Sequence, residues 1–305
     1  MIRHVLTRLA YMLPVVWLVV SVVFLLIHLV PGDPIQAMLG EGAAGADIQA
    51  ARHAYGLDVP LPVQYVHYWK GVVHGDLGRS LRLNKPVRAL VMQAYPATIT
   101  LAMAALSVAV ILSIPAGVRS AVRRNRWDDR ALSFVSLLGL SFPNFALGPI
   151  LILLFAIRLD LLPVSGASSW RSIVLPAVTM GASLAAILTR MVRTSMLEEL
   201  GQDYIRTARA KGLSERRVVY GHALRNAMIP VVTVLGLQFG ALLAGAIVTE
   251  KIFAYPGIGR LAIDAISNRD YALVQGCLLC IGLTYVAVNF LTDLVYSALN
   301  PRIRQ

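Results

Sequence analysis

Six long runs of hydrophobic residues, separated by polar and basic segments, dominate the chain. They lie near residues 9–30, 96–118, 131–157, 173–189, 228–249 and 272–297. A helix needs about 20 predominantly apolar residues to cross the hydrocarbon core of a bilayer. The pattern therefore predicts an all-α membrane protein with six transmembrane helices.

The first run follows Arg3, His4 and Arg8, so a cleavable signal peptide has to be considered. The apolar stretch is too long for the core of a signal peptide, and no small-x-small cleavage site precedes Pro31. Residues 1–30 are therefore expected to form an N-terminus and a retained first transmembrane helix.

Composition agrees with a membrane protein. Hydrophobic residues make up 57% of the chain and charged residues only 14%, against about 25% charged in soluble domains. This balance excludes a soluble enzyme, a secreted disulfide scaffold and a disordered chain. The net charge of +12 does not indicate nucleic acid, because long apolar runs separate the charges instead of leaving them on one basic face.

The basic residues instead indicate topology. Of the 28 Lys and Arg residues, 17 lie in segments 1–8, 119–130, 190–227 and 298–305, which together hold 66 residues, and the other 11 lie in the 102 residues of the remaining segments between the runs. Cytoplasmic loops carry the excess of Lys and Arg in membrane proteins. Both termini are therefore predicted to lie in the cytoplasm, with 298–305 as a cytoplasmic tail.

Segment 31–95 is then external, and it is long enough to contain structure of its own. Tyr65, Val66, Tyr68, Trp69, Val72 and Val73 form an aromatic and apolar patch. This patch predicts a short helix that either lies at the membrane interface or packs against a neighbouring subunit.

A basic stripe follows this patch, in which Arg79, Arg82, Lys85 and Arg88 recur every three residues. They form either a basic stripe that meets a binding protein or a peptide carboxylate, or a solvated face.

Residues 96–297 are expected to form a core of five helices. Pro115, Pro143, Pro149 and Pro176 are expected to kink or interrupt these helices. Ser141, Asn144 and Phe145 surround Pro143 and are candidates for lining a translocation path, as is Gln238; packing polarity is the alternative. Gly236 and Gly240, continued by Ala244, predict close helix packing.

Several chemistries find no support in the sequence. The central parts of the predicted helices contain no Asp, Glu, Lys or Arg, which argues against a proton-driven carrier or a voltage-gated channel. Cys277 and Cys280 are interpreted as small apolar helix residues, because a structural zinc site needs four ligands. No protease motif is present, and none of the four lysines follows a glycine, so the P-loop is absent. We therefore expect no catalytic residue, metal or cofactor in this chain, and any pumping needs energy from another subunit.

The polar segment 190–227 is where such a subunit is expected to bind. Asp203 can begin a short helix, Gly212 suits the left-handed position that ends one, and Ser214 can cap a second. The small residues of such a helix–glycine–helix hook, Ala208, Ala210 and Gly212, would let its backbone approach a partner groove closely. The alternative is a basic loop that lies on anionic lipid headgroups.

This segment also carries a resemblance to a known family. Arg206–Gly212 and His222–Pro230 resemble the E-A-A loop of bacterial ABC importer permeases, in the variant of the dipeptide, oligopeptide and nickel class. Ala208 matches the second alanine of the motif, Gly212 the glycine, and Leu224 the leucine of its later I-x-L-P.

Three positions depart from the general motif in the way that is typical of the peptide class. Arg206 and Thr207 replace glutamate and alanine, and Arg225 stands at the proline. Other segments are similar to the B-type permease subunit of that class: Pro31–Pro34, Tyr55–Asp58, Gly75–Ser80, Leu162–Pro163, Glu250–Phe253, Pro256–Gly259 and Arg269–Tyr271.

The resemblance implies one half of the translocation domain of a type I ABC importer in the bacterial inner membrane. Its implied partners are a second homologous permease, two cytoplasmic ATPases that bind ATP and magnesium, an external substrate-binding protein and membrane lipid. The implied ATPase-coupling residues are Asp203, Tyr204, Arg206, Thr207, Ala208, Arg209, Lys211, Gly212, Leu213, Leu224 and Arg225. The expected function is uptake of dipeptides or oligopeptides. The alternatives are nickel or another small solute, or a self-sufficient channel or ion-coupled carrier.

Overall fold

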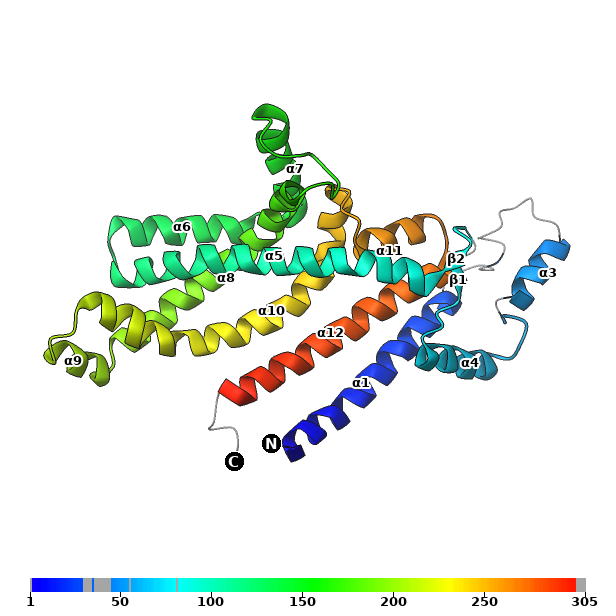
Figure 1. Cartoon of the computed structure of the whole chain (residues 1–305), viewed down its shortest axis with the longest axis horizontal. Helices are drawn as coiled ribbons and strands as arrows, with labels where there is room; N and C mark the ends of the chain where they lie inside the picture. The colour runs from blue at the N-terminus through cyan, green and yellow to red at the C-terminus, as the bar shows by residue number, and fades with distance from the viewer. Residues whose placement is uncertain (1, 30–34, 36–44, 55, 81, 300–305) are drawn as a thin grey trace. The chain divides into compact units, whose positions relative to one another are not determined.

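The computed structural model describes residues 2–29, 35, 45–54, 56–80 and 82–299, and most of them are helical (Figure 1). The segment Pro31–Pro34, quoted above for its resemblance, lies outside these residues. The α-helices are α1 (Ile2–Leu29), α3 (Gly45–Ala54), α4 (Leu61–His74), α5 (Val87–Val122), α6 (Trp127–Ser141), α7 (Asn144–Leu151), α8 (Val174–Leu200), α9 (Asp203–Ala210), α10 (Leu224–Ile252), α11 (Ile258–Ser267) and α12 (Tyr271–Leu299). Two strands, β1 (Arg79–Ser80) and β2 (Lys85–Pro86), form a small hairpin. Short helical segments of other types are the π-helices η1 (Ile152–Arg158) and η3 (Arg217–Ala223) and the 3₁₀-helix η2 (Trp170–Ile173).

Five helical stretches are long and apolar enough to cross a membrane, and they coincide with five of the six predicted runs. They are Thr7–Leu29, Val87–Val122, Trp170–Leu200, Arg217–Leu243 and Tyr271–Leu294. The prediction of an all-helical membrane protein is therefore confirmed.

The remaining run, 131–157, is a broken span rather than one straight helix. Its two halves, Trp127–Ser141 and Asn144–Arg158, are bent by 105°. The break lies at Phe142 and Pro143, because a residue that precedes proline is pushed into extended backbone; Phe142 has φ −89° and ψ 116°. The sequence prediction counts this run as one span, which holds only when the bent pair is taken together.

The other three named prolines do not interrupt the helices in which they lie. Pro115 and Pro149 lie inside α5 and α7, and both helices continue through them. Pro176 lies in the first turn of α8, where a helix tolerates proline because that N–H has no intrahelical partner. Only Pro143 among the four named prolines marks a break between helices.

The chain divides into two compact units, which are described separately. One comprises residues 1–98 and 256–290, and the other comprises residues 99–255 and 291–305.

In the first unit, the predicted aromatic helix is present as α4, and its aromatic side chains pack on α1. Tyr65 contacts Phe24 edge to face with ring centroids 5.2 Å apart, and its hydroxyl lies 2.7 Å from Ser21 Oγ. The opposite face of α4 leaves Val66 and Val73 exposed.

A buried polar contact joins two of the quoted motifs in the same unit. Ser80, in the β-hairpin, donates a hydrogen bond to the carboxylate of Asp270, and both side chains are buried. Asp270 also accepts a hydrogen bond from the N–H of Leu273 (3.2 Å), which satisfies a free donor at the start of α12. The Gly75–Ser80 and Arg269–Tyr271 segments are therefore parts of one structure.

Beside this contact lies an apolar core that contains Val87, Ile258, Leu273 and Cys277. Cys277 therefore packs as a small apolar residue, as expected from the sequence. The basic stripe is exposed, but it does not form a helical face, because Arg79 and Lys85 lie in the hairpin and Arg88 lies in α5.

In the second unit α8 is central, and α6, α7 and α10 all pack against it. Small residues set the close approaches: a Cβ atom on Gly181 would lie 2.7 Å from the carbonyl oxygen of Ala105, and one on Gly236 would lie 2.2 Å from Thr292 Cγ2. The close packing predicted at Gly236 is therefore confirmed, and its partner Thr292 belongs to α12 of the same chain. The side chain of Ala244 lies outside the described set.

Candidate functional site

The predicted hook is present in the structure between α8 and α10, and we define it as residues 203–225. Its first helix, α9, begins at Asp203 as predicted, and a carboxylate in the first turn is favourable near the positive end of a helix. The helix ends at Ala210, and Gly212, two residues on, has a φ of +77° in the left-handed region. The N–H groups of Gly212 and Leu213 donate to the carbonyls of Arg209 (2.9 Å) and Ala208 (3.3 Å). This is the Schellman arrangement that glycine favours.

An ion pair closes the turn that follows. Arg209 Nε lies 2.7 Å from Glu215 Oε1, and helix resumes at Glu215, directly after Ser214. The second helix that the sequence predicts after Ser214 is therefore present, and it is longer than the hook. Helix continues from Glu215 through η3 into α10 without a break, so the hook is rigidly continuous with a membrane-spanning helix.

The hook has a buried face and an exposed face. Ile205 is fully buried and Ala208 is only 7% exposed, and both pack within the chain together with Val218 of η3. The side chain of Ala208 therefore packs inside the chain, and the close approach of its backbone to a partner groove stays a prediction. The other predicted coupling residues are all exposed or half-buried: Asp203, Tyr204, Arg206, Thr207, Arg209, Lys211, Gly212, Leu213, Leu224 and Arg225. Leu224 lies at the start of α10, and its side chain is half-buried.

One side chain of the hook links three helices. The Tyr204 hydroxyl, in α9, donates a hydrogen bond to the carboxylate of Glu199 in α8 and accepts one of 3.1 Å from Asn226 Nδ2 in α10. Burial and the neighbouring Glu199 raise the pKa of Tyr204, so the phenol stays protonated at neutral pH. Glu199 and Asn226 were not among the predicted residues, because neither periodicity nor spacing shows that they converge on one side chain.

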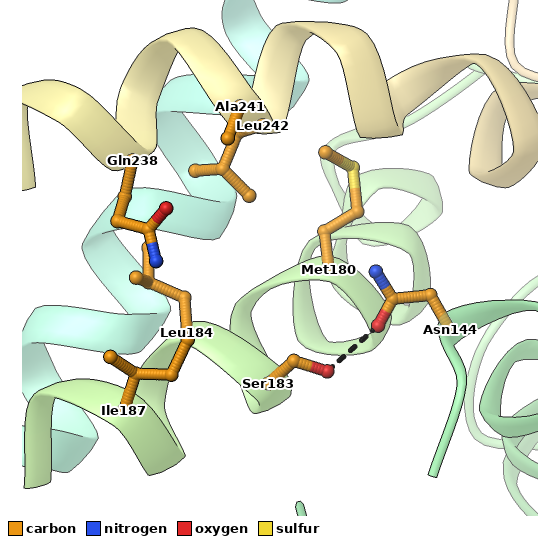
Figure 2. A pocket seen from close by; sticks show the side chains of 8 residues that line it. All are labelled: Asn144, Met180, Ser183, Leu184, Ile187, Gln238, Ala241 and Leu242. Atoms are coloured by element: carbon orange, nitrogen blue, oxygen red, sulfur yellow. Dashed lines mark hydrogen bonds between the residues drawn. The ribbon is translucent and has the colours of Figure 1, made fainter. Parts of the chain in front are cut away.

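An open pocket of about 160 Å³ lies between α7, α8 and α10 (Figure 2). Its lining consists of Asn144, Met180, Ser183, Leu184, Ile187, Gln238, Ala241 and Leu242. Ser183 Oγ donates a hydrogen bond of 2.9 Å to Asn144 Oδ1. The structure thus brings together Asn144 and Gln238, two of the four predicted path residues that are 94 positions apart in sequence.

The other two predicted path residues lie outside this lining. Ser141 bonds to the carbonyl of Leu137 in its own helix (2.9 Å), and Phe145 is 62% exposed. Ser183 and Met180 are lining residues that were not predicted, since a single serine or methionine in an apolar helix is not a distinctive signal.

A buried charged cluster fixes the turn between α5 and α6 to α8. Arg193 of α8 binds Asp129 with both Nε (2.7 Å) and Nη2 (2.9 Å), and the N–H of Asn125 donates to the same carboxylate (2.9 Å). Asp128 pairs with Arg123 at 2.9 Å. These contacts hold the end of α8 that leads into the hook.

Two family models match this chain. The model of the family described as "Binding-protein-dependent transport system inner membrane component" matches residues 113–305. The corresponding N-terminal family model matches residues 1–102. The two matches together leave only 103–112 uncovered.

The chain is similar along its whole length to curated relatives. It is 44% identical over 304 residues to the glutathione transport system permease protein GsiC of Escherichia coli (strain K12), covering 100% of this chain and 99% of that protein. The same protein of Salmonella choleraesuis (strain SC-B67) is also 44% identical over 304 residues.

Solved structures share the fold at low sequence identity. An inward-facing MetNI methionine ABC transporter aligns with a TM-score of 0.57 and 18% identity over 69% of this chain and 96% of that one. An amino acid ABC transporter solved with histidines aligns with a TM-score of 0.55 and 12% identity, over 69% and 94% of the two chains. The resemblance to ABC importer permeases is therefore confirmed, and the chain belongs to the binding-protein-dependent transport system inner membrane components, the multi-pass permease subunits of ABC importers.

Proposed function

We propose that this chain forms one half of the translocation pathway of an importer for short peptides, with glutathione as the first candidate substrate. The observation that carries this proposal is the 44% identity to glutathione permeases over the full length of both chains. Glutathione is itself a small peptide, which agrees with the dipeptide and oligopeptide class expected from the sequence.

The proposed machine contains further subunits. A second homologous permease completes the pathway, two cytoplasmic ATPases bind ATP and magnesium, and an external protein delivers the substrate. With both termini in the cytoplasm, segment 190–227 lies on the side of the ATPases and segment 31–95 on the side of the binding protein.

The hook is the proposed contact with one ATPase. Its outer surface consists of Asp203, Arg206, Thr207, Ala210, Lys211 and Gly212, all exposed. Ala208, Ile205 and Val218 hold the hook together from inside. The unbroken helix from Glu215 into α10 supports a rigid-body transfer of ATPase motion to the membrane helices.

The pocket between α7, α8 and α10 is the proposed part of the pathway in this chain. Motion of the hook is passed to α8 and α10, the two longer helices that line the pocket, since Tyr204 bonds to residues of both. Asn144 and Gln238 line this pocket, whereas Ser141 and Phe145 can line the pathway only outside it.

The test is uptake by the complete importer, purified with its partner subunits and placed in liposomes. Labelled glutathione, a dipeptide and nickel are offered separately with the matched binding protein. We expect ATP-dependent accumulation of glutathione or the dipeptide, and no flux through vesicles that contain only this chain. Accumulation of nickel alone would overturn the peptide assignment, and flux through the isolated chain would overturn the importer mechanism.

A further inference from the structure

The pocket between α7, α8 and α10 is lined mostly by apolar side chains, with a few neutral polar ones. Three of its eight lining residues carry neutral hydrogen-bonding groups, namely Asn144, Ser183 and Gln238. The other five are Met, Leu, Ile or Ala, so the lining contains no ionisable side chain. The polar groups come from three different helices and face one space (Figure 2).

Part of this hydrogen-bonding capacity is unused within the described chain. Ser183 occupies one acceptor position of Asn144 and so fixes the orientation of that amide. The Asn144 Nδ2 group and the whole Gln238 amide have no hydrogen-bond partner among the residues that the structure describes. A primary amide offers two donors and one carbonyl acceptor. The pocket therefore presents both donors and acceptors to whatever enters it.

The size and polarity of the pocket restrict its ligand. Sites that enclose a whole small molecule measure about 300–1,000 Å³, so a space of about 160 Å³ accommodates one segment of a substrate. A charged group would enter without a counter-charge, which is costly away from water. A peptide bond, which is neutral and has one donor and one acceptor, fits both restrictions.

We propose that this pocket is a transit site that binds a neutral peptide-bond segment of the passing substrate and disfavours its charged ends. The inference rests on the proposed function in taking the substrate to be a peptide, and it goes further by assigning Gln238, Asn144 and Ser183 the recognition of backbone amides. The charged termini of the substrate then stay in the wider aqueous path or are met by other subunits.

The test measures protection of a reporter cysteine in the complete, nucleotide-free importer. Ala241 lines the pocket and is exposed, so Ala241→Cys in a Cys277→Ala, Cys280→Ala background places a thiol there without removing a polar group. Its rate of alkylation by N-ethylmaleimide is followed with and without neutral N-acetylglycinamide. A small site binds with millimolar affinity, so about 50 mM of this probe is expected to slow alkylation at least about threefold.

Three comparisons decide the outcome. N-acetylglycine, of nearly the same size but anionic, should protect much less. Gln238→Leu in the reporter chain should abolish protection by the neutral probe. Leu237→Cys, on the same helix but outside the lining, should be alkylated at a rate that the probe does not change.

Equal protection by the neutral and anionic probes would overturn the proposal, as would protection that survives Gln238→Leu. A reporter thiol at 241 that is not alkylated would also overturn it, because the pocket would then be covered, for instance by the second permease. This assay requires no transport, so it separates the two proposals. An importer that shows selective protection but moves no peptide would refute the proposed function and leave the pocket assignment standing.

Discussion

Tyr204 shows how one residue can connect the proposed ATPase contact to the proposed pathway. Its hydroxyl bonds to Glu199 and Asn226, at the adjoining ends of α8 and α10. A hydrogen bond to a charged group contributes about 1.5–3 kcal/mol. Because these bonds join α8 to α10 through the hook, we expect the tyrosine hydroxyl to matter for the transfer of motion more than for folding.

We predict that Tyr204→Phe lowers the number of substrate molecules imported per ATP hydrolysed by about fivefold or more, while the complex still assembles. The ring stays in place and only the two hydrogen bonds are lost. Tyr220→Phe is the matched control, since Tyr220 lies nearby in η3, is exposed and makes no hydrogen bond within the described chain. Equal effects of the two substitutions would refute a specific role for Tyr204.

The same residue predicts a pH dependence. Burial and Glu199 raise the pKa of Tyr204 above its ordinary value of 10. The stabilising contribution of the protonated phenol is then complete below pH 10 and is lost only as the pH rises through the raised pKa. Absorbance titration of the phenolate, taken as the difference between the wild type and Tyr204→Phe, should show Tyr204 ionising above pH 10, and ionisation below pH 10 would contradict the structure.

At the scale of elements, the hook and the α5–α6 turn are held by different kinds of contact. A Cβ atom added to Gly212 would meet no other atom within 4 Å, so backbone conformation rather than lack of space dictates glycine at the end of the first hook helix. The α5–α6 turn is fixed by the buried carboxylate of Asp129. We therefore make one prediction for Gly212 and one for Asp129.

We expect Gly212→Asp to fold and assemble but to lower uptake per ATP by about tenfold or more. Aspartate and asparagine are the non-glycine residues that best tolerate left-handed backbone, whereas added bulk and charge disturb a close contact with the ATPase. Gly212→Asn separates the two effects, because it adds the bulk without the charge. Wild-type uptake by the Gly212→Asp variant at normal expression would show that the hook does not couple.

The Asp129 cluster predicts a stability effect. Asp129→Asn leaves the half-buried Arg193 guanidinium without its counter-charge, and loss of a hydrogen bond to a charged group costs about 1.5–3 kcal/mol. Thermal unfolding in detergent should therefore occur at a clearly lower temperature. Asp203→Asn breaks an exposed pair with Arg206, worth at most about 1 kcal/mol, and is the control. Similar melting temperatures for the two variants would contradict the structure.

At the scale of the whole molecule, the apolar runs predicted the helical membrane fold, because about 20 apolar residues have few other stable placements. Gly212 and Asp203 predicted the ends of α9 correctly, since capping depends on local backbone geometry. The convergence of Asn144, Ser183 and Gln238, the burial of Ala208 and the three-helix role of Tyr204 could not be predicted. They depend on how segments far apart in sequence pack together, and one sequence does not show this.

The central claim is that this permease has no energy source of its own and receives motion through its hook. The most direct test places a photoreactive amino acid at the exposed position Thr207 in the transporting complex, with the exposed Arg82, in the segment proposed to be external, as control. The account predicts adducts between position 207 and an ATPase subunit, and none with an ATPase from position 82. A complex that imports substrate yet yields no ATPase adduct from position 207 would contradict it.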